Sequence, residues 1–203
     1  MPCSDSRVSV LAGALMALMP WLAVAAETDA KQEAVRGAYL ASGCVQAENC
    51  PRFDEVYATT PPLRHALALH LRHGGAAVPQ WVKHKLVQRG RARDAASRDP
   101  GPAQAQMPTT ASPMLPLRID DRSYLLGDMN DPQDPRHRIV ALYDTHRGSA
   151  TLHYVDRDGT AALLGDTQPL LRRVMMDYLN PGSDFARSLA RPDVALPVAV
   201  RGE

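Results

Sequence analysis

The sequence predicts an α+β fold in which an antiparallel β-sheet of about five strands is flanked by helices. Apolar residues alternate with polar ones along several short runs between residues 117 and 164, which is the period of a half-buried strand. Turn signals such as Asp158-Gly159 separate these runs, so neighbouring strands are expected to pair as hairpins. Helical apolar stripes over residues 63–71 and 170–179 supply the flanking helices. With 203 residues, 45% of them hydrophobic and 22% charged, the chain is expected to hold one globular domain with extensions.

The N-terminus has the pattern of a secretory signal peptide over residues 1–26. Arg7 precedes a long apolar run that ends in Pro20 and small residues, and cleavage is expected after Ala25 or Ala26. The alternative is a transmembrane anchor, which this proline and the small residues at the cleavage point disfavour. No later stretch is long and apolar enough to span a bilayer. The mature protein is therefore predicted to be periplasmic or secreted, without a membrane partner after cleavage.

The predicted compartment determines how the cysteines are interpreted. Removal of residues 1–26 takes Cys3 away and leaves Cys44 and Cys50 as a pair, which predicts a disulfide in an oxidising space. A loop this short is expected to gain about 2 to 3 kcal/mol from the bond. The C-x5-C spacing matches neither a C-x-x-C redox motif nor a zinc site.

The formal net charge of +1 gives no electrostatic reason to expect nucleic acid as a partner.

The first half of the mature chain is expected to be helical. Residues 29–42 are good helix formers followed by Gly43, a residue that often ends a helix. The polar residues after this helix are interpreted as a disulfide-tied appendage, so residues 27–61 form an N-terminal extension. A second helix begins at the Pro61-Pro62 pair and ends at Gly74.

The domain itself is assigned to residues 62–180 and contains a flexible linker at 89–113, which is rich in Arg, Ala, Ser, Thr and Pro and poor in bulky apolar residues. No aromatic residues lie among its arginines, so the linker is not interpreted as a nucleic-acid site. The last helix is expected from Pro169 to Leu179. Residues 181–203 are interpreted as a tail with a short helix and an apolar run, and the sequence leaves open whether that run adds an edge strand.

The candidate working part is a polar loop between two strand-like runs, Ser123–Leu126 and Ile139–Tyr143. Its prolines remove backbone donors and fix φ, so the segment is expected neither to extend the strands nor to form a helix. It is predicted to project between the strands. The loop consists of Asn130, Asp131, Pro132, Gln133, Asp134, Pro135, Arg136 and His137.

The order of these parts resembles the inhibitor of vertebrate lysozyme (Ivy) family. The resemblance covers roughly residues 63–180, and its most specific pieces are the Pro79-Gln80-Trp81-Val82 segment and the loop followed by the strand that begins Arg138-Ile139. It implies a periplasmic protein with an antiparallel sheet and flanking helices, and it allows a homodimer. It also implies a lysozyme-type hydrolase, of the C type, as partner. In the family, a loop reading Cys-Lys-Pro-His-Asp-Cys and closed by a disulfide enters the cleft of C-type lysozyme, where its histidine meets the catalytic carboxylates.

The corresponding stretch of this chain is Asn130-Asp131-Pro132-Gln133-Asp134-Pro135, which keeps the proline and the aspartate but has neither the cysteines nor the histidine. Loss of the disulfide raises the ordering cost of binding, which the two prolines are expected to offset in part. The Gln133 amide can still donate to a carboxylate. Asp131 and Asp134 are expected to repel a target's carboxylates, and Arg136 and His137 to oppose this repulsion.

Two other functional classes are open. Asp128, Asn130, Asp131 and Asp134 supply oxygens for a cation-stabilised structural loop, although the glycine and the terminal glutamate of an EF-hand are absent. An enzyme is disfavoured because the sequence contains no Gly-x-Ser-x-Gly elbow, no phosphate-binding glycine loop and no His-Glu-x-x-His motif. The prediction is a binding protein without catalytic residues, metal site or cofactor.

Overall fold

The computed structural model describes residues 36–83, 86, 110–166, 168–191 and 193–202, all of which belong to one compact unit. The helices are α2 (Arg36–Ser42), the short 3-10 helix η1 (Ala47–Asn49), α3 (Phe53–Thr59), α4 (Pro61–His73), α6 (Pro169–Leu179) and α7 (Asp184–Leu189). The strands are β1 (Leu115–Ile119), β2 (Arg122–Asn130), β3 (Arg138–Asp144), β4 (Ser149–Val155), β5 (Ala161–Gly165) and β6 (Val198–Val200). The predicted α+β class is therefore confirmed.

The six strands form one sheet in the order β5-β4-β3-β2-β1-β6. Strands β1 to β5 pair as antiparallel neighbours, as the turn signals predict. The sixth strand makes the sheet mixed, because β6 pairs in parallel with β1. The apolar run near the C-terminus thus does add an edge strand.

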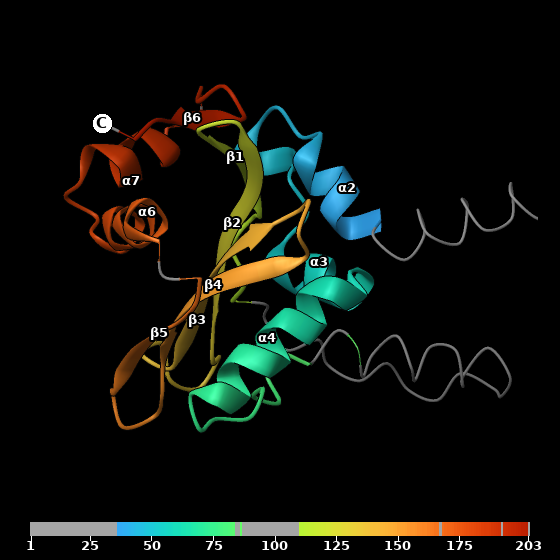
Figure 1. Cartoon of the computed structure of the whole chain (residues 1–203), viewed down its shortest axis with the longest axis vertical. Helices are drawn as coiled ribbons and strands as arrows, with labels where there is room; N and C mark the ends of the chain where they lie inside the picture. The colour runs from blue at the N-terminus through green and yellow to red at the C-terminus, as the bar shows by residue number, and fades with distance from the viewer. Residues whose placement is uncertain (1–35, 84–85, 87–109, 167, 192, 203) are drawn as a thin grey trace, which may run out of the picture. The chain divides into compact units, whose positions relative to one another are not determined.

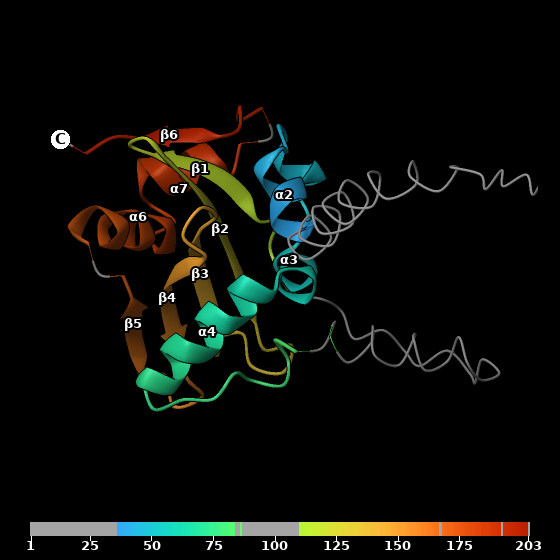
Figure 2. The same cartoon turned by 45° about the vertical axis from the view of Figure 1, so that its right-hand side comes forward.

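Helices cover both faces of this sheet. In Figures 1 and 2, α2, α3 and α4 lie on one face and α6 and α7 on the other. Successive residues of β3 alternate between the two cores: Ile139 and Ala141 pack on the side of α4, and Val140 and Leu142 pack on the side of α6. This central strand is consequently apolar at almost every position, which is the pattern of a strand buried on both faces.

The boundaries of α4 follow the proline and glycine signals. Two prolines occupy its first positions, where a missing N–H costs nothing. Leu63, Leu67 and Leu71 lie one turn apart and are completely buried. Gly74 ends the helix, with its N–H donating to the His70 carbonyl at 3.0 Å. Within the described part of the chain, no helix is long and apolar enough to cross a membrane.

Residues 27–61 were interpreted as an N-terminal extension, but the part of this segment that the structure describes packs as part of the domain. The helix predicted over 29–42 is described from Arg36 onward. Residues 44–60 are part of the domain core, because Phe53 and Val56 of α3 are completely buried against the same cluster as α4. Phe53 and Val56 lie three residues apart and therefore share one helix face. This apolar face was not predicted, because α3 is short and its first turn is acidic.

Parts of the segments interpreted as a linker and a tail also pack into the domain. Residues 110–113, the end of the expected linker, join the sheet through the bridge between Ala111 and Met129. In the expected tail, Leu189 of α7 and Leu196 are buried in the core beneath α6. The expected signal peptide, 1–26, and the remainder of the linker, 89–109, lie outside the described residues.

Candidate functional site

The loop between β2 and β3 is a compact turn closed by its own backbone. Asn130 and Arg138 are the last pair of the ladder, so residues 131–137 form the loop. The Asp131 N–H donates to the His137 carbonyl at 2.8 Å, and the His137 N–H donates to the Asp134 carbonyl at 3.0 Å. A third bond, from the Asp134 N–H to the Asp131 carbonyl, measures 3.2 Å. These bonds bring both ends of the loop together without a covalent link.

The Asp131 side chain braces the loop from inside. Only 4% of the residue is exposed. Its Oδ1 accepts a hydrogen bond from the Gln133 N–H at 2.9 Å, the geometry by which an aspartate stabilises the turn that follows it. Its Oδ2 lies 3.3 Å from His137 Nδ1 and 3.8 Å from the guanidinium of Arg157. The carboxylate is therefore turned into the protein, where the His137 ring and the Arg157 guanidinium face it.

His137 connects the loop to two other elements. Its ring is buried, and Trp81 lies edge-on to it with the ring centres 5.1 Å apart. The indole Nε1 of Trp81 donates to His137 Nδ1 at 3.3 Å, and His137 Nε2 lies 3.2 Å from the Tyr154 hydroxyl. Burial raises the pKa of Tyr154, with a further contribution from a nearby aspartate, so this hydroxyl keeps its proton at neutral pH.

The hydrogen-bond partner of His137 Nδ1 depends on which of the two ring nitrogens carries the proton. When Nε2 carries the proton, Nδ1 accepts from Trp81 and Nε2 donates to Tyr154. When Nδ1 carries it, Nδ1 donates to Asp131 and Nε2 accepts from Tyr154. In either form the His137 ring packs against Trp81, in the segment after α4, and is hydrogen-bonded to Tyr154 of β4. We call Asp131, His137, Trp81 and Tyr154 the clasp.

The tip of the loop points outward. Gln133, Pro135 and Arg136 are exposed, and Pro132 and Asp134 are half-buried. The Arg136 guanidinium binds the Asp134 carboxylate with two contacts, Nε to Oδ1 at 3.1 Å and Nη2 to Oδ2 at 3.2 Å. These hydrogen bonds lower the pKa of Asp134, so the pair is an intimate, overall neutral ion pair at neutral pH.

The structure thus divides the eight predicted loop residues. Asp131 and His137 lie inside, five others form the outer surface, and half-buried Asn130 ends β2, where its carbonyl accepts from the Thr110 hydroxyl. The contributions of Trp81 and Tyr154 to the loop were missed. The Pro-x-Trp-Val motif was the available signal for Trp81, whereas Tyr154 was visible only as one apolar position in a strand.

The carboxylates proposed for a cation site have separate partners. Asp128 accepts from the Tyr178 hydroxyl at 2.7 Å, Asp131 faces His137, and Asp134 binds Arg136. Among the described residues, no group of three or more His, Cys, Asp or Glu side chains could hold a metal ion. No specific observation favours the cation-stabilised loop.

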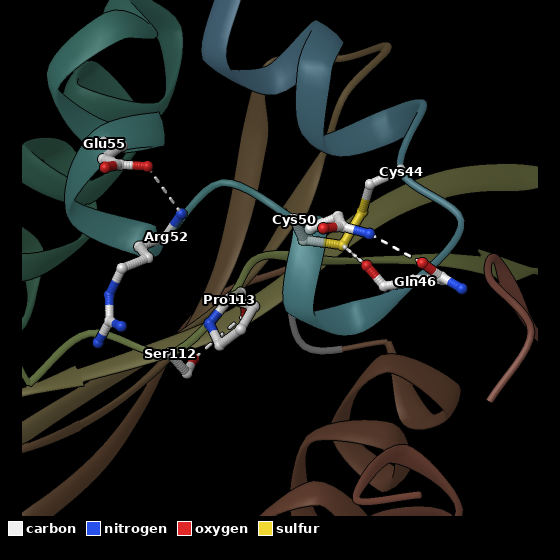
Figure 3. The surroundings of a disulfide bond; sticks show 8 residues. Cys44, Gln46, Cys50, Arg52, Glu55, Ser112 and Pro113 are labelled. Atoms are coloured by element: carbon white, nitrogen blue, oxygen red, sulfur yellow. Dashed lines mark hydrogen bonds between the residues drawn. A yellow bond between two sulfur atoms is a disulfide. The ribbon is translucent and has the colours of Figure 1, made fainter. Parts of the chain in front are cut away.

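The predicted disulfide between Cys44 and Cys50 is present, with the two Cα atoms 5.4 Å apart. It encloses η1, and Ser112 and Pro113, which precede β1, are among its surroundings (Figure 3). The disulfide is therefore a local staple on the body of the domain and does not touch the loop.

Comparison with known proteins assigns no family. No protein-family model matches the chain, and no curated protein matches it either.

Proposed function

We propose that this protein is an Ivy-like secreted inhibitor that binds a lysozyme-type hydrolase, in the first instance a C-type lysozyme, by placing the tip of the 131–137 loop in its cleft. The observation that carries the proposal is the pre-organisation of this loop. Backbone bonds, the Asp131 turn and the buried clasp hold it in one conformation before any partner arrives. A loop already ordered in its free state avoids the entropy cost of ordering on binding.

The clasp substitutes for the disulfide of the family loop. The positions that correspond to the two cysteines are Asn130 and Pro135, which cannot form a covalent bond. Asp131 and His137 instead close the loop from within, one at each end, with their side chains 3.3 Å apart. A noncovalent closure of this kind depends on burial, and both residues are at least 94% buried.

The loop also reduces the repulsion that its sequence implies toward an acidic cleft. Asp131 is turned inward, so its charge does not face a partner. Asp134 is neutralised by Arg136. The outer surface then consists of two prolines, this neutral pair and the Gln133 amide, whose N–H groups can donate to a carboxylate of the target.

The test is inhibition of peptidoglycan turnover by C-type lysozyme with stoichiometric to micromolar protein. We expect turnover to fall as protein is added, and Gln133→Ala to weaken the inhibition because the donor at the tip is lost. Gln168→Ala is the matched control, since Gln168 is also exposed but precedes α6, in another part of the domain. Undiminished turnover at micromolar protein would refute the proposal.

A further inference from the structure

Strand β5 forms an open border of the sheet (Figures 1 and 2). It pairs with β4 on one side, and among the described residues no strand lies on its other side. Proteins usually protect such a border with charged side chains, a proline or a bulge. β5 has none of these, because its sequence is Ala-Ala-Leu-Leu-Gly and its pairing with β4 is regular. An unprotected border of this kind is suited to pairing with a further strand.

The hydrogen-bond pattern fixes which backbone groups of β5 face this border. The Asp156 N–H donates to the Thr160 carbonyl at 3.0 Å, so this pair at the hairpin turn is a hydrogen-bonded one. Hydrogen-bonded and non-hydrogen-bonded pairs alternate along antiparallel strands. Ala161 and Leu163, which lie one and three residues further on, therefore direct their N–H and C=O groups away from β4. These groups are the donors and acceptors that the border offers.

The same groups are complementary to those of a second copy of β5. In an antiparallel pair centred on Leu163, the middle residue of the strand, each Leu163 N–H donates to the Leu163 carbonyl of the other copy. Ala161 of one copy then lies opposite Gly165 of the other, so the whole strand is paired. The two Leu163 side chains become neighbours on the face that carries α6, where they bury apolar surface. No charged residue within the strand opposes this approach.

The hairpin turn before β5 carries excess negative charge. It contains Asp156 and Asp158 with one arginine, Arg157, between them. The Arg157 guanidinium lies 3.8 Å from Asp131 of its own loop, so its charge is directed toward that carboxylate. Antiparallel pairing brings this turn of one copy to the segment that follows β5 in the other copy.

That following segment is basic. α6 has no acidic residue in its first turn and carries Arg172 and Arg173. Between β5 and α6 the sequence has one acidic residue, Asp166, whose carboxylate accepts from the Gln168 N–H of its own chain at 3.1 Å. The positive N-terminal end of the α6 dipole adds to the attraction for an acidic turn. This charge complementarity at both ends of the strand favours a second copy as the occupant of the border.

We propose that β5 is a homodimer interface, at which two copies of the chain pair in antiparallel fashion about Leu163 and form one continuous sheet. The proposal goes beyond lysozyme inhibition and does not depend on it. Dimerisation uses the border of β5, whereas inhibition uses Gln133 at the tip of another loop, so each can fail without the other.

The first measurement is sedimentation equilibrium of the full protein, purified as its host cell produces it, from low micromolar to submillimolar concentration. We expect the mass to rise from that of one chain to that of two. Ala161→Pro removes an outward N–H from each copy, at the first position of an edge strand, where proline is tolerated. It should weaken the dimer by about tenfold or more. Ala161→Ser is the matched control, because it keeps the N–H, and it should dimerise as the wild type does.

Amide hydrogen exchange of the wild-type protein locates the contact without any substitution. The Leu163 N–H is open in the monomer and bonded to the second copy in the dimer. Its exchange should therefore slow as the protein concentration is raised through the range in which the mass doubles. In Ala161→Pro at the same concentrations it should remain fast.

The mass of a single chain at every concentration would overturn the proposal. A dimer whose Leu163 amide exchanges at a rate independent of concentration would overturn it as well, because the copies would then meet at another surface. The same conclusion would follow if Ala161→Pro dimerised as tightly as Ala161→Ser.

Discussion

Replacement of His137 by alanine tests whether the clasp holds the loop. The substitution removes the bond to Tyr154 and the bond shared between Trp81 and Asp131. Each hydrogen bond contributes about 1 kcal/mol net, and a buried carboxylate left short of a partner costs about 1 to 3 kcal/mol. The lost ring also leaves a cavity, which adds a cost of its own. These contributions are not additive, and we expect the free energy of unfolding to fall by about 3 kcal/mol in total.

The measurement is urea unfolding followed by tryptophan fluorescence. Trp21 belongs to the predicted signal peptide, so Trp81, which lies against His137, is the only tryptophan of the predicted mature chain. The free energy is obtained by linear extrapolation to zero urea. For a chain of this size a loss of about 3 kcal/mol corresponds to a melting temperature lower by about 6 to 12 °C.

His146→Ala is the matched control. His146 lies exposed in the turn after β3, where truncation is expected to change stability by no more than about 0.5 kcal/mol. If His137→Ala costs less than about 1 kcal/mol, so that the two variants behave alike, His137 is not a structural support of the loop and the argument for pre-organisation is wrong.

Three further predictions concern the scaffold. Gly165→Ala should lower the free energy of unfolding by several kcal/mol, measured in urea, because a Cβ there would lie 2.1 Å from a β4 carbonyl oxygen and φ is +91°; wild-type stability would contradict this close approach. Replacing Cys44 and Cys50 together by serine should cost about 2 to 3 kcal/mol by the same assay, and a change below about 0.5 kcal/mol would show that the staple is dispensable. Burial, followed by the charge of Arg138, lowers the pKa of His153 in the folded protein below its ordinary value near 6.5. The neutral imidazole therefore stabilises the fold fully at pH values above 6.5, and this stabilisation is lost as the pH falls through the lower pKa of the folded state. The free energy of unfolding, measured from pH 7.5 to 5, should therefore fall less steeply in His153→Gln, and identical slopes would count against this assignment.

The elements predicted from sequence are those specified by local chemistry. Strands β2 and β4 follow from alternation, β3 follows from its continuous apolar run, and the order of the three follows from the turns between them. The ends of α4 follow from the Pro61-Pro62 pair and Gly74, and the disulfide follows from the number of cysteines. In each case the determining residues lie within a few positions of one another.

The features that were left open or missed depend on long-range contacts. β6 has three residues and pairs with a strand about 80 positions earlier, so its own sequence carries a weak signal. The inward direction of Asp131 and His137 depends on Trp81, which is 56 positions from His137, and on Tyr154, which is 17 positions away. From sequence alone, a polar residue in a proline-rich loop is expected to be exposed, because distant partners such as Trp81 and Tyr154 cannot be identified.

Lysozyme inhibition is tested most directly by titrating C-type lysozyme with the wild-type protein at fixed peptidoglycan. We expect turnover to fall to a plateau near one equivalent of protein. Gln133→Ala should require several-fold more protein, while Gln168→Ala should follow the wild type. Lysozyme that retains full activity in the presence of micromolar wild-type protein would contradict the proposed inhibition.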